Sequence, residues 1–213
     1  MANDDLENAA ARADLCRLLA ACYYEPGPEF EEEDVFGSMQ EAAATIDPDL
    51  AASVRRLGDA YAAADRQALL VDYTRLFLGP IDMLAKPYGS VWLDGAGGLM
   101  EDSTMAVLAL YEESGFAIDE AFRDLPDHVA AELEFLYLLL FRESEARFRG
   151  DAEALAGIVA RRRRFLDAHL GRWVGPFTAA VREGAQTGFY RELGALTDRF
   201  VGRVAGGDGA AQR

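Results

Sequence analysis

Lysine is nearly missing from this sequence, in which Lys86 is the only one. The 21 basic residues, almost all arginine, face 37 aspartates and glutamates, so the formal net charge is -16. Binding to nucleic-acid phosphates needs an excess of positive charge. The composition therefore argues against nucleic acid as a partner and favours a basic one.

Groups that bind metals or act as nucleophiles are also scarce. The chain has two histidines, His128 and His169, and two cysteines, Cys16 and Cys22. Six positions along a helix rotate the cysteines by roughly 240°, so they should not pair. The sequence has no Glu-x-x-His pair of the di-iron bundles, no nucleophile elbow and no phosphate-binding glycine loop. We therefore expect no metal and no cofactor. The remaining enzyme hypothesis is a helical enzyme with His128 as general base.

Long apolar runs and strand patterns are missing as well. No uncharged stretch reaches 18 residues and no basic-plus-apolar leader opens the chain, so we expect a cytoplasmic protein without stable membrane insertion. Apolar residues recur at helical rather than alternating spacing, as in residues 6–24. A chain of 213 residues can build one substantial core. These features predict a single all-α domain, a helical bundle spanning residues 1–213.

Several helix boundaries follow from local signals. Asp47 followed by Pro48 is typical of an N-cap and first helical position. Gly79 should end the helix before it, and Ser103 should cap the helix that follows it. Residues 161–164, four consecutive arginines, cover every face of a helix and are expected to lie in solvent beside acidic partners.

Residues 79–98, "GPIDMLAKPYGSVWLDGAGG", interrupt the helical pattern and predict the one long loop. The loop contains two prolines, five glycines and the aromatic residues Tyr88 and Trp92. Apolar side chains in a loop either pack down as a lid or bind a partner, and the residues alone leave both readings open. The same segment is a possible hinge. We expect a monomer, or a dimer that exchanges helical halves across it.

"DLPDH", residues 124–128, precedes the most apolar helical segment of the chain. Asp124 is the expected N-cap, Pro126 fits an early helical position, and Asp127 opposes the positive helix terminus. His128 should then lie in the first turn, where the helix dipole disfavours the cation, so we expect a neutral imidazole.

Two longer motifs occur in a characteristic order: "YTRLFLGPIDMLAKPYGSVWLDG" at 73–95 and "DLPDHVAAELEFLYLLL" at 124–140. Together with "FYRELGALTDRFV" at 189–201, they span most of the chain. In these motifs the sequence resembles the TorD/DmsD/NarJ family of redox-enzyme maturation chaperones.

The resemblance implies an all-helical cytoplasmic chaperone, not an enzyme. Such a protein binds the twin-arginine leader and the apo catalytic subunit of a molybdopterin-dependent enzyme of the dimethyl-sulfoxide reductase family, and it assists cofactor insertion before export. The binding surface implied by the resemblance consists of Leu76, Phe77, Gly79, Tyr88, Ser90, Trp92, Asp127 and His128.

The chemistry of a twin-arginine leader suits this surface. The leader joins a basic region to an apolar, helix-prone segment, and the chain offers an acidic surface beside an aromatic loop. We expect the Asp127 carboxylate to accept an arginine in a bidentate manner while Tyr88 and Trp92 receive the apolar segment. A stable leader complex favours the chaperone, whereas turnover or a bound metal favours the enzyme.

Overall fold

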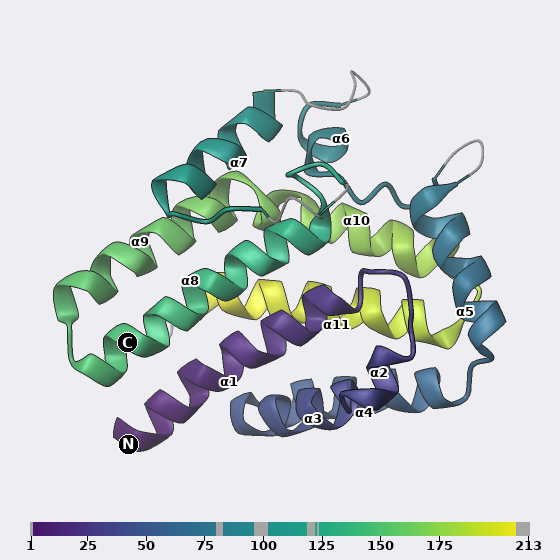
Figure 1. The fold of residues 1–213 in the computed structure, drawn as a ribbon, viewed down its shortest axis with the longest axis horizontal. Coiled ribbons are helices and arrows are strands. Elements are labelled where there is room, and N and C mark those ends of the chain that lie inside the picture. The colour runs from purple at the N-terminus through teal and green to yellow at the C-terminus, as the bar shows by residue number, and fades with distance from the viewer. Residues whose placement is uncertain (1, 80–82, 96–101, 119–121, 123, 208–213) are drawn as a thin grey trace. The chain divides into compact units, whose positions relative to one another are not determined.

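The computed structural model describes residues 2–79, 83–95, 102–118, 122 and 124–207. Over these residues the regular structure is helical and contains no strand, which confirms the predicted all-α class (Figure 1). Backbone contacts divide the chain into two compact units. The first unit comprises Met1–Ala21 and Tyr88–Trp173, and the second comprises Cys22–Pro87 and Val174–Arg213. The boundary after Pro87 lies within the predicted hinge segment.

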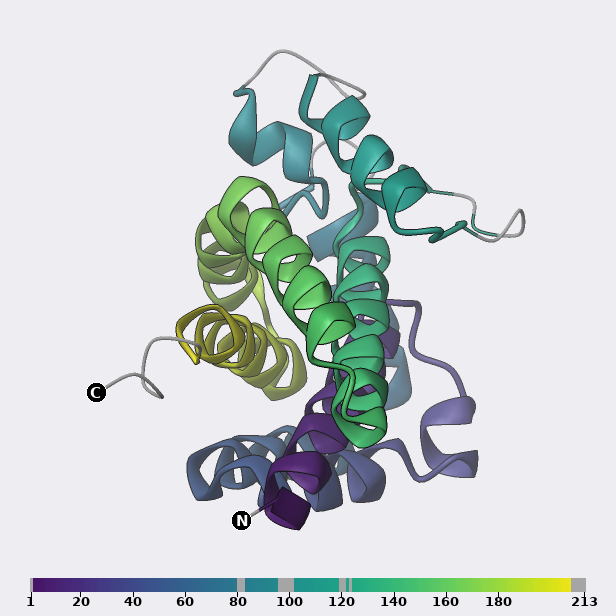
Figure 2. The ribbon, with the colours of Figure 1, turned by 90° about the vertical axis from the view of Figure 1, so that its left-hand side faces the viewer.

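The first unit contains the long helix α8 (Val129–Arg149), against which α1 (Ala2–Ala21) and α9 (Ala152–Ala168) pack. Its other elements are α6 (Gly89–Leu93), α7 (Asp102–Glu113) and the start of α10 (Leu170–Gly184). Helix α1 runs antiparallel along α8, as Figures 1 and 2 show, and the Cys16 thiol lies 3.4 Å from the Leu133 carbonyl oxygen. Helix α9 returns along α8 after Gly150, whose φ of 67° suits a glycine at a helix end.

The second unit contains two helix pairs and an aromatic core. Its elements are α2 (Glu29–Glu32), α3 (Val35–Ile46), α4 (Pro48–Ala62), α5 (Arg66–Tyr73), the π-helix η1 (Thr74–Leu78), the rest of α10, and α11 (Gly188–Gly206). Helix α4 packs on α3 and on α11. Arg56 pairs with Glu192 at 3.0 Å. Residues near opposite ends of the two helices also pair, with Arg203 2.5 Å from Asp47, so α4 and α11 are antiparallel.

Two predicted helix ends are confirmed because their signals are local. The Asp47 carboxylate accepts hydrogen bonds from the backbone N–H groups of Asp49 and Leu50, at 2.8 and 3.2 Å, while Pro48 is the first helical residue. Gly79 ends η1 with a φ of 46°, and its N–H donates to the Thr74 carbonyl at 2.7 Å. The final turn is therefore a π-turn rather than an α-turn.

Three other expectations are wrong in part. Ser103 lies inside α7 instead of capping it, because its N–H and hydroxyl both donate to the Asp94 carboxylate. The 79–98 segment includes the helix α6, although residues 80–82 and 96–98 lie outside the described residues. Within the arginine run, Arg162 is buried against Glu143 rather than solvated. Among the described residues, no helix combines the length and apolarity needed to cross a membrane.

Candidate functional site

Asp127 joins the start of α6 to the segment that leads into α8. Its backbone carbonyl accepts a hydrogen bond from the Gly89 N–H at 2.8 Å, and its carboxylate Oδ2 accepts one from the Ser90 N–H, also at 2.8 Å. The side chain is only 1% exposed. The other carboxylate oxygen, Oδ1, has no hydrogen-bond partner within the described residues. Asp127 therefore caps α6 and retains one unused acceptor.

The N-cap of α8 is His128, so the predicted cap at Asp124 is wrong. The first helical residue is Val129. His128, directly before it, has an extended backbone, and its Nδ1 accepts the Ala130 N–H at 3.1 Å. Asp124 cannot cap the helix from its position. Its carboxylate instead accepts the N–H of the adjacent Leu125, so Pro126 and Asp127 precede the helix.

The bond to Ala130 requires an unprotonated Nδ1 and hence the neutral imidazole that the sequence predicted. The physical cause differs from the expected one. Burial lowers the pKa of His128, against opposing effects of Asp124 and Asp127. The second nitrogen, Nε2, lies 3.9 Å from the Asp124 carboxylate.

Aromatic rings flank the histidine. The Tyr88 ring meets the His128 ring edge-on with centroids 5.6 Å apart, and the two backbones form an isolated antiparallel bridge. Phe122 contributes a second ring at 6.0 Å. Tyr88 and Ser90 are buried, whereas Trp92 on α6 is partly exposed. The aromatic part of the predicted loop is thus packed against the start of α8.

A carboxyl group that the sequence reasoning assigned no role lies beside this cluster. Glu132 is 1% exposed, and its Oε2 accepts a hydrogen bond from the indole N–H of Trp173 at 3.1 Å. Burial raises the pKa of Glu132 well above its usual range, and the nearby Asp127 raises it further, while the bond from Trp173 opposes this. The sequence signal for this residue is an acid within the most apolar helix of the chain.

Three residues of the predicted surface lie in the second unit, where two of them belong to its core. Leu76 and Phe77 are buried, and the Phe77 ring contacts Tyr23 at 6.0 Å and Tyr190 at 5.6 Å. The third, Gly79, terminates η1. Leu78, which the sequence did not single out, is 49% exposed.

The structure thus brings together Tyr88, Ser90, Asp127 and His128, with Trp92 on the same short helix. Leu76, Phe77 and Gly79 form a separate group in the second unit. In the described ranges, no three His, Cys, Asp or Glu side chains converge in a way that could hold a metal ion.

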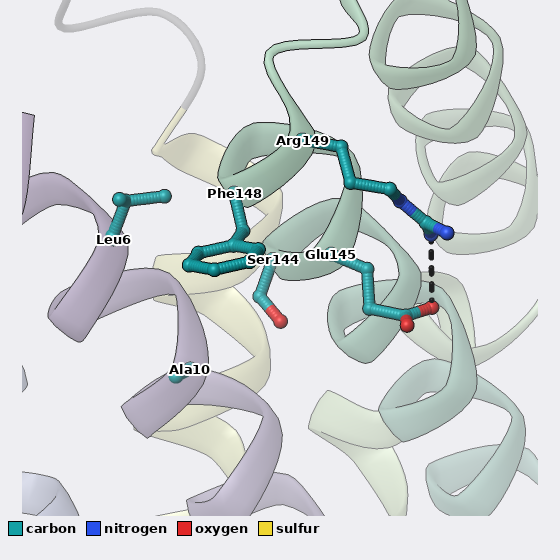
Figure 3. A pocket seen from close by; sticks show the side chains of 6 residues that line it. All are labelled: Leu6, Ala10, Ser144, Glu145, Phe148 and Arg149. Carbon is teal, nitrogen blue, oxygen red and sulfur yellow. Dashed lines mark ion pairs between the residues drawn. The ribbon is translucent and has the colours of Figure 1, made fainter.

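A second surface feature is a groove of about 430 Å³ between the N-terminal part of α1 and the C-terminal part of α8 (Figure 3). Phe148 lies beside Leu6 in this groove and is 81% exposed. Glu145 and Arg149 form an ion pair at 3.3 Å on its α8 side. No predicted site residue lines the groove, so it offers a distinct apolar surface.

Comparison with known proteins yields one family and several relatives. The family described as nitrate reductase delta subunit matches residues 43–179. The chain is 26% identical over 132 residues to the chaperone protein TorD of Vibrio parahaemolyticus, a match covering 62% of this chain and 60% of that protein. It is 30% identical over 124 residues to the Tat proofreading chaperone DmsD of Salmonella typhi, covering 58% and 54% of the two chains.

A solved structure shares the fold. The crystal structure of a putative redox enzyme maturation protein from Archaeoglobus fulgidus superposes with a TM-score of 0.54. The superposition covers 90% of this chain and 93% of that one, at 21% sequence identity.

Proposed function

Because the chain belongs to the nitrate reductase delta subunit family, we propose that it is a cytoplasmic, system-specific chaperone. It binds the twin-arginine leader and the apo catalytic subunit of a molybdopterin-dependent enzyme of the dimethyl-sulfoxide reductase family. It assists cofactor insertion and proofreads the client before export. The similarity to the chaperone protein TorD and to the Tat proofreading chaperone DmsD supports this role.

The observation that carries the proposal is the cluster of Tyr88, Ser90, Asp127 and His128. Two separate sequence motifs meet through hydrogen bonds from Gly89 and Ser90 to Asp127, the second of them across 37 positions of the chain. Interface positions that combine aromatic rings with a charged group in a desolvated setting contribute most to peptide binding. We propose that this cluster is the leader-binding site.

Asp127 Oδ1 is the acceptor that we assign to a leader arginine. It has no partner within the described residues, although its carboxylate is buried. A guanidinium carries several N–H donors, one of which can satisfy this oxygen while the hydrogen bond from the Ser90 N–H stays in place. The net charge of -16 also favours a basic partner.

The alternative enzyme hypothesis gains little from the geometry. A general base needs an accessible lone pair, and the Nδ1 lone pair of His128 already accepts the Ala130 N–H. In that tautomer Nε2 carries the proton, and the ring is buried between Tyr88 and Phe122. His128 is therefore better suited to fixing the start of α8 than to abstracting a proton.

Calorimetric titration can test the leader site. The probe is a synthetic peptide with two adjacent arginines followed by an apolar segment of roughly 7–15 residues, compared with a peptide that has glutamines in place of the arginines. Asp127→Asn should weaken binding of the arginine peptide by about 2 kcal/mol or more. Added salt should weaken wild-type binding more than binding to the variant. Salt screens the attraction between Asp127 and the leader arginine, and the variant lacks that attraction.

The groove supplies the matched control. Phe148→Ser removes its most exposed ring, and we expect leader affinity to stay within about twofold, a change of under 0.5 kcal/mol that is usual for surface substitutions. Loss of binding in Phe148→Ser together with unchanged binding in Asp127→Asn would move the leader site to the groove.

A further inference from the structure

Gly89 lies in contact with two side chains from distant parts of the first unit. A β-carbon at this position would lie 3.0 Å from Glu132 Oε1 and 3.0 Å from the indole nitrogen of Trp173. Such spacing is tighter than most real β-carbon contacts. The Gly89 backbone therefore rests directly on the Glu132–Trp173 pair, and the residues on either side of Gly89 are Tyr88 and Ser90 of the proposed leader site.

The two buried carboxyl groups near Gly89 differ in their hydrogen bonding. Asp127 accepts the Ser90 N–H on its carboxylate and the Gly89 N–H on its backbone carbonyl. Glu132 accepts only the Trp173 indole, and its Oε1 has no partner in the described part of the chain. A buried carboxylate with a single donor beside another carboxyl group costs more free energy than the neutral acid, which has no charge to desolvate.

We infer that Glu132 is a positioning residue of the leader site: its carboxyl group, fixed by Trp173, holds Gly89 and so seats Tyr88 and Ser90 against His128 and Asp127. This inference rests on the proposed function. Glu132 does not touch the leader in this arrangement. It acts through the backbone of residues 88–90.

The charges around Glu132 favour the same protonation state. Asp127 acts on it from the segment before α8, and the Tyr111 phenol of α7 stays neutral because burial raises its pKa. Gly89 of α6 and Trp173 of α10 are uncharged, and the thiol of Cys16 on α1 stays neutral because burial raises its pKa. The raised pKa of Glu132 itself agrees with the geometry.

Three substitutions separate this role from a charged one. Glu132→Gln keeps the shape and the acceptor of the neutral acid, so it should bind the arginine peptide within about twofold of wild type. Glu132→Ala removes the support for Gly89 and should weaken binding roughly 5- to 30-fold, the range of a large single-site effect. Glu145→Gln, which removes a carboxyl group from the same helix in the groove, should leave affinity unchanged.

A pH series gives a readout that does not depend on the leader. The folded protein holds the Glu132 proton more tightly than the unfolded chain, so wild-type stability should fall relative to Glu132→Gln as pH rises above the ordinary range of a glutamate. Below about pH 4 the urea midpoints of the two proteins should coincide. Every other titrating group is common to both, so the difference reports Glu132 alone.

The outcomes identify which claim fails. If wild type does not bind the arginine peptide, the proposed function is wrong, while the urea series still tests the protonation state. If wild type binds and Glu132→Ala binds equally well, the positioning role is wrong. If Glu132→Gln loses as much affinity as Glu132→Ala, or if its midpoint runs parallel to that of wild type at every pH, the carboxyl group acts as an anion and the inference is overturned.

Discussion

Replacing Asp72 with alanine should strongly destabilise the second unit, although no local sequence signal marks Asp72 of α5 as a helix cap. Its buried carboxylate accepts hydrogen bonds from the N–H groups of Gln186 and Thr187, at 2.9 and 2.7 Å, and from the Thr187 hydroxyl at 2.8 Å. Arg75 adds a fourth donor at 3.0 Å. Thr187 precedes α11 and provides no side-chain cap of its own, so Asp72 caps this helix from α5.

The size of the effect follows from the donors that lose their partner. Two backbone N–H groups each lose a charged acceptor, at about 2 kcal/mol apiece, so Asp72→Ala should cost about 4 kcal/mol. In a chain of this length that loss lowers the melting temperature by roughly 8–16 °C. Asp72→Asn keeps one acceptor oxygen and should cost about half as much.

Asp65→Ala is the matched control, since Asp65 is an exposed N-cap that accepts only the Ala68 N–H, at 3.2 Å. It should cost about 1 kcal/mol. The assay is urea unfolding followed by circular dichroism, with the urea dependence of the free energy compared among variants. An Asp72→Ala variant no less stable than Asp65→Ala would refute the idea that a distant carboxylate caps α11.

Two further outcomes can be checked in the same unfolding assay. Arg162→Leu leaves the buried Glu143 carboxylate without its ion-pair partner and should lower the free energy of unfolding by about 3–5 kcal/mol. Adding Glu143→Leu should recover most of this loss. Equal stability of the single and double variants would contradict the reasoning. Burial lowers the pKa of His128, so the unfolded chain binds a proton at this residue more readily than the folded protein does. As pH falls below about 6.5, wild type should therefore lose stability relative to His128→Asn, by at most about 1.4 kcal/mol per pH unit. A constant difference between the two proteins from pH 7 to pH 5 would speak against a buried neutral imidazole.

What the sequence predicted well was decided within a few residues. The helix ends at Asp47 and at Gly79 depend on hydrogen bonds to residues nearby in the sequence. They can therefore be predicted from the sequence alone. The family motifs pointed to Tyr88, Ser90, Asp127 and His128, and these four residues meet in the structure.

What could not be predicted depends on partners distant in the sequence. Glu132 meets Trp173 across 41 positions, and Asp72 meets Thr187 across 115. The N-cap of α8 is His128 rather than Asp124, and the Asp127 carboxylate binds the N–H of Ser90, 37 positions before it in the sequence. Helical periodicity shows which face of a helix is apolar, but it does not show which hydrogen-bond donor a buried acidic side chain will contact.

The interleaved course of the chain has a kinetic consequence for the dimer proposed from the hinge at 79–98. Each unit is built from segments on both sides of that hinge: the first takes α1 from before it and α8 from after it, and the second takes α4 from before it and α11 from after it. Two molecules that exchange halves must first separate both of these helix pairs, which amounts to opening both cores. Exchange should therefore be about as slow as unfolding itself. The proportion of dimer in a sample then records the protein concentration at which the chains folded, and dilution afterwards does little to change it.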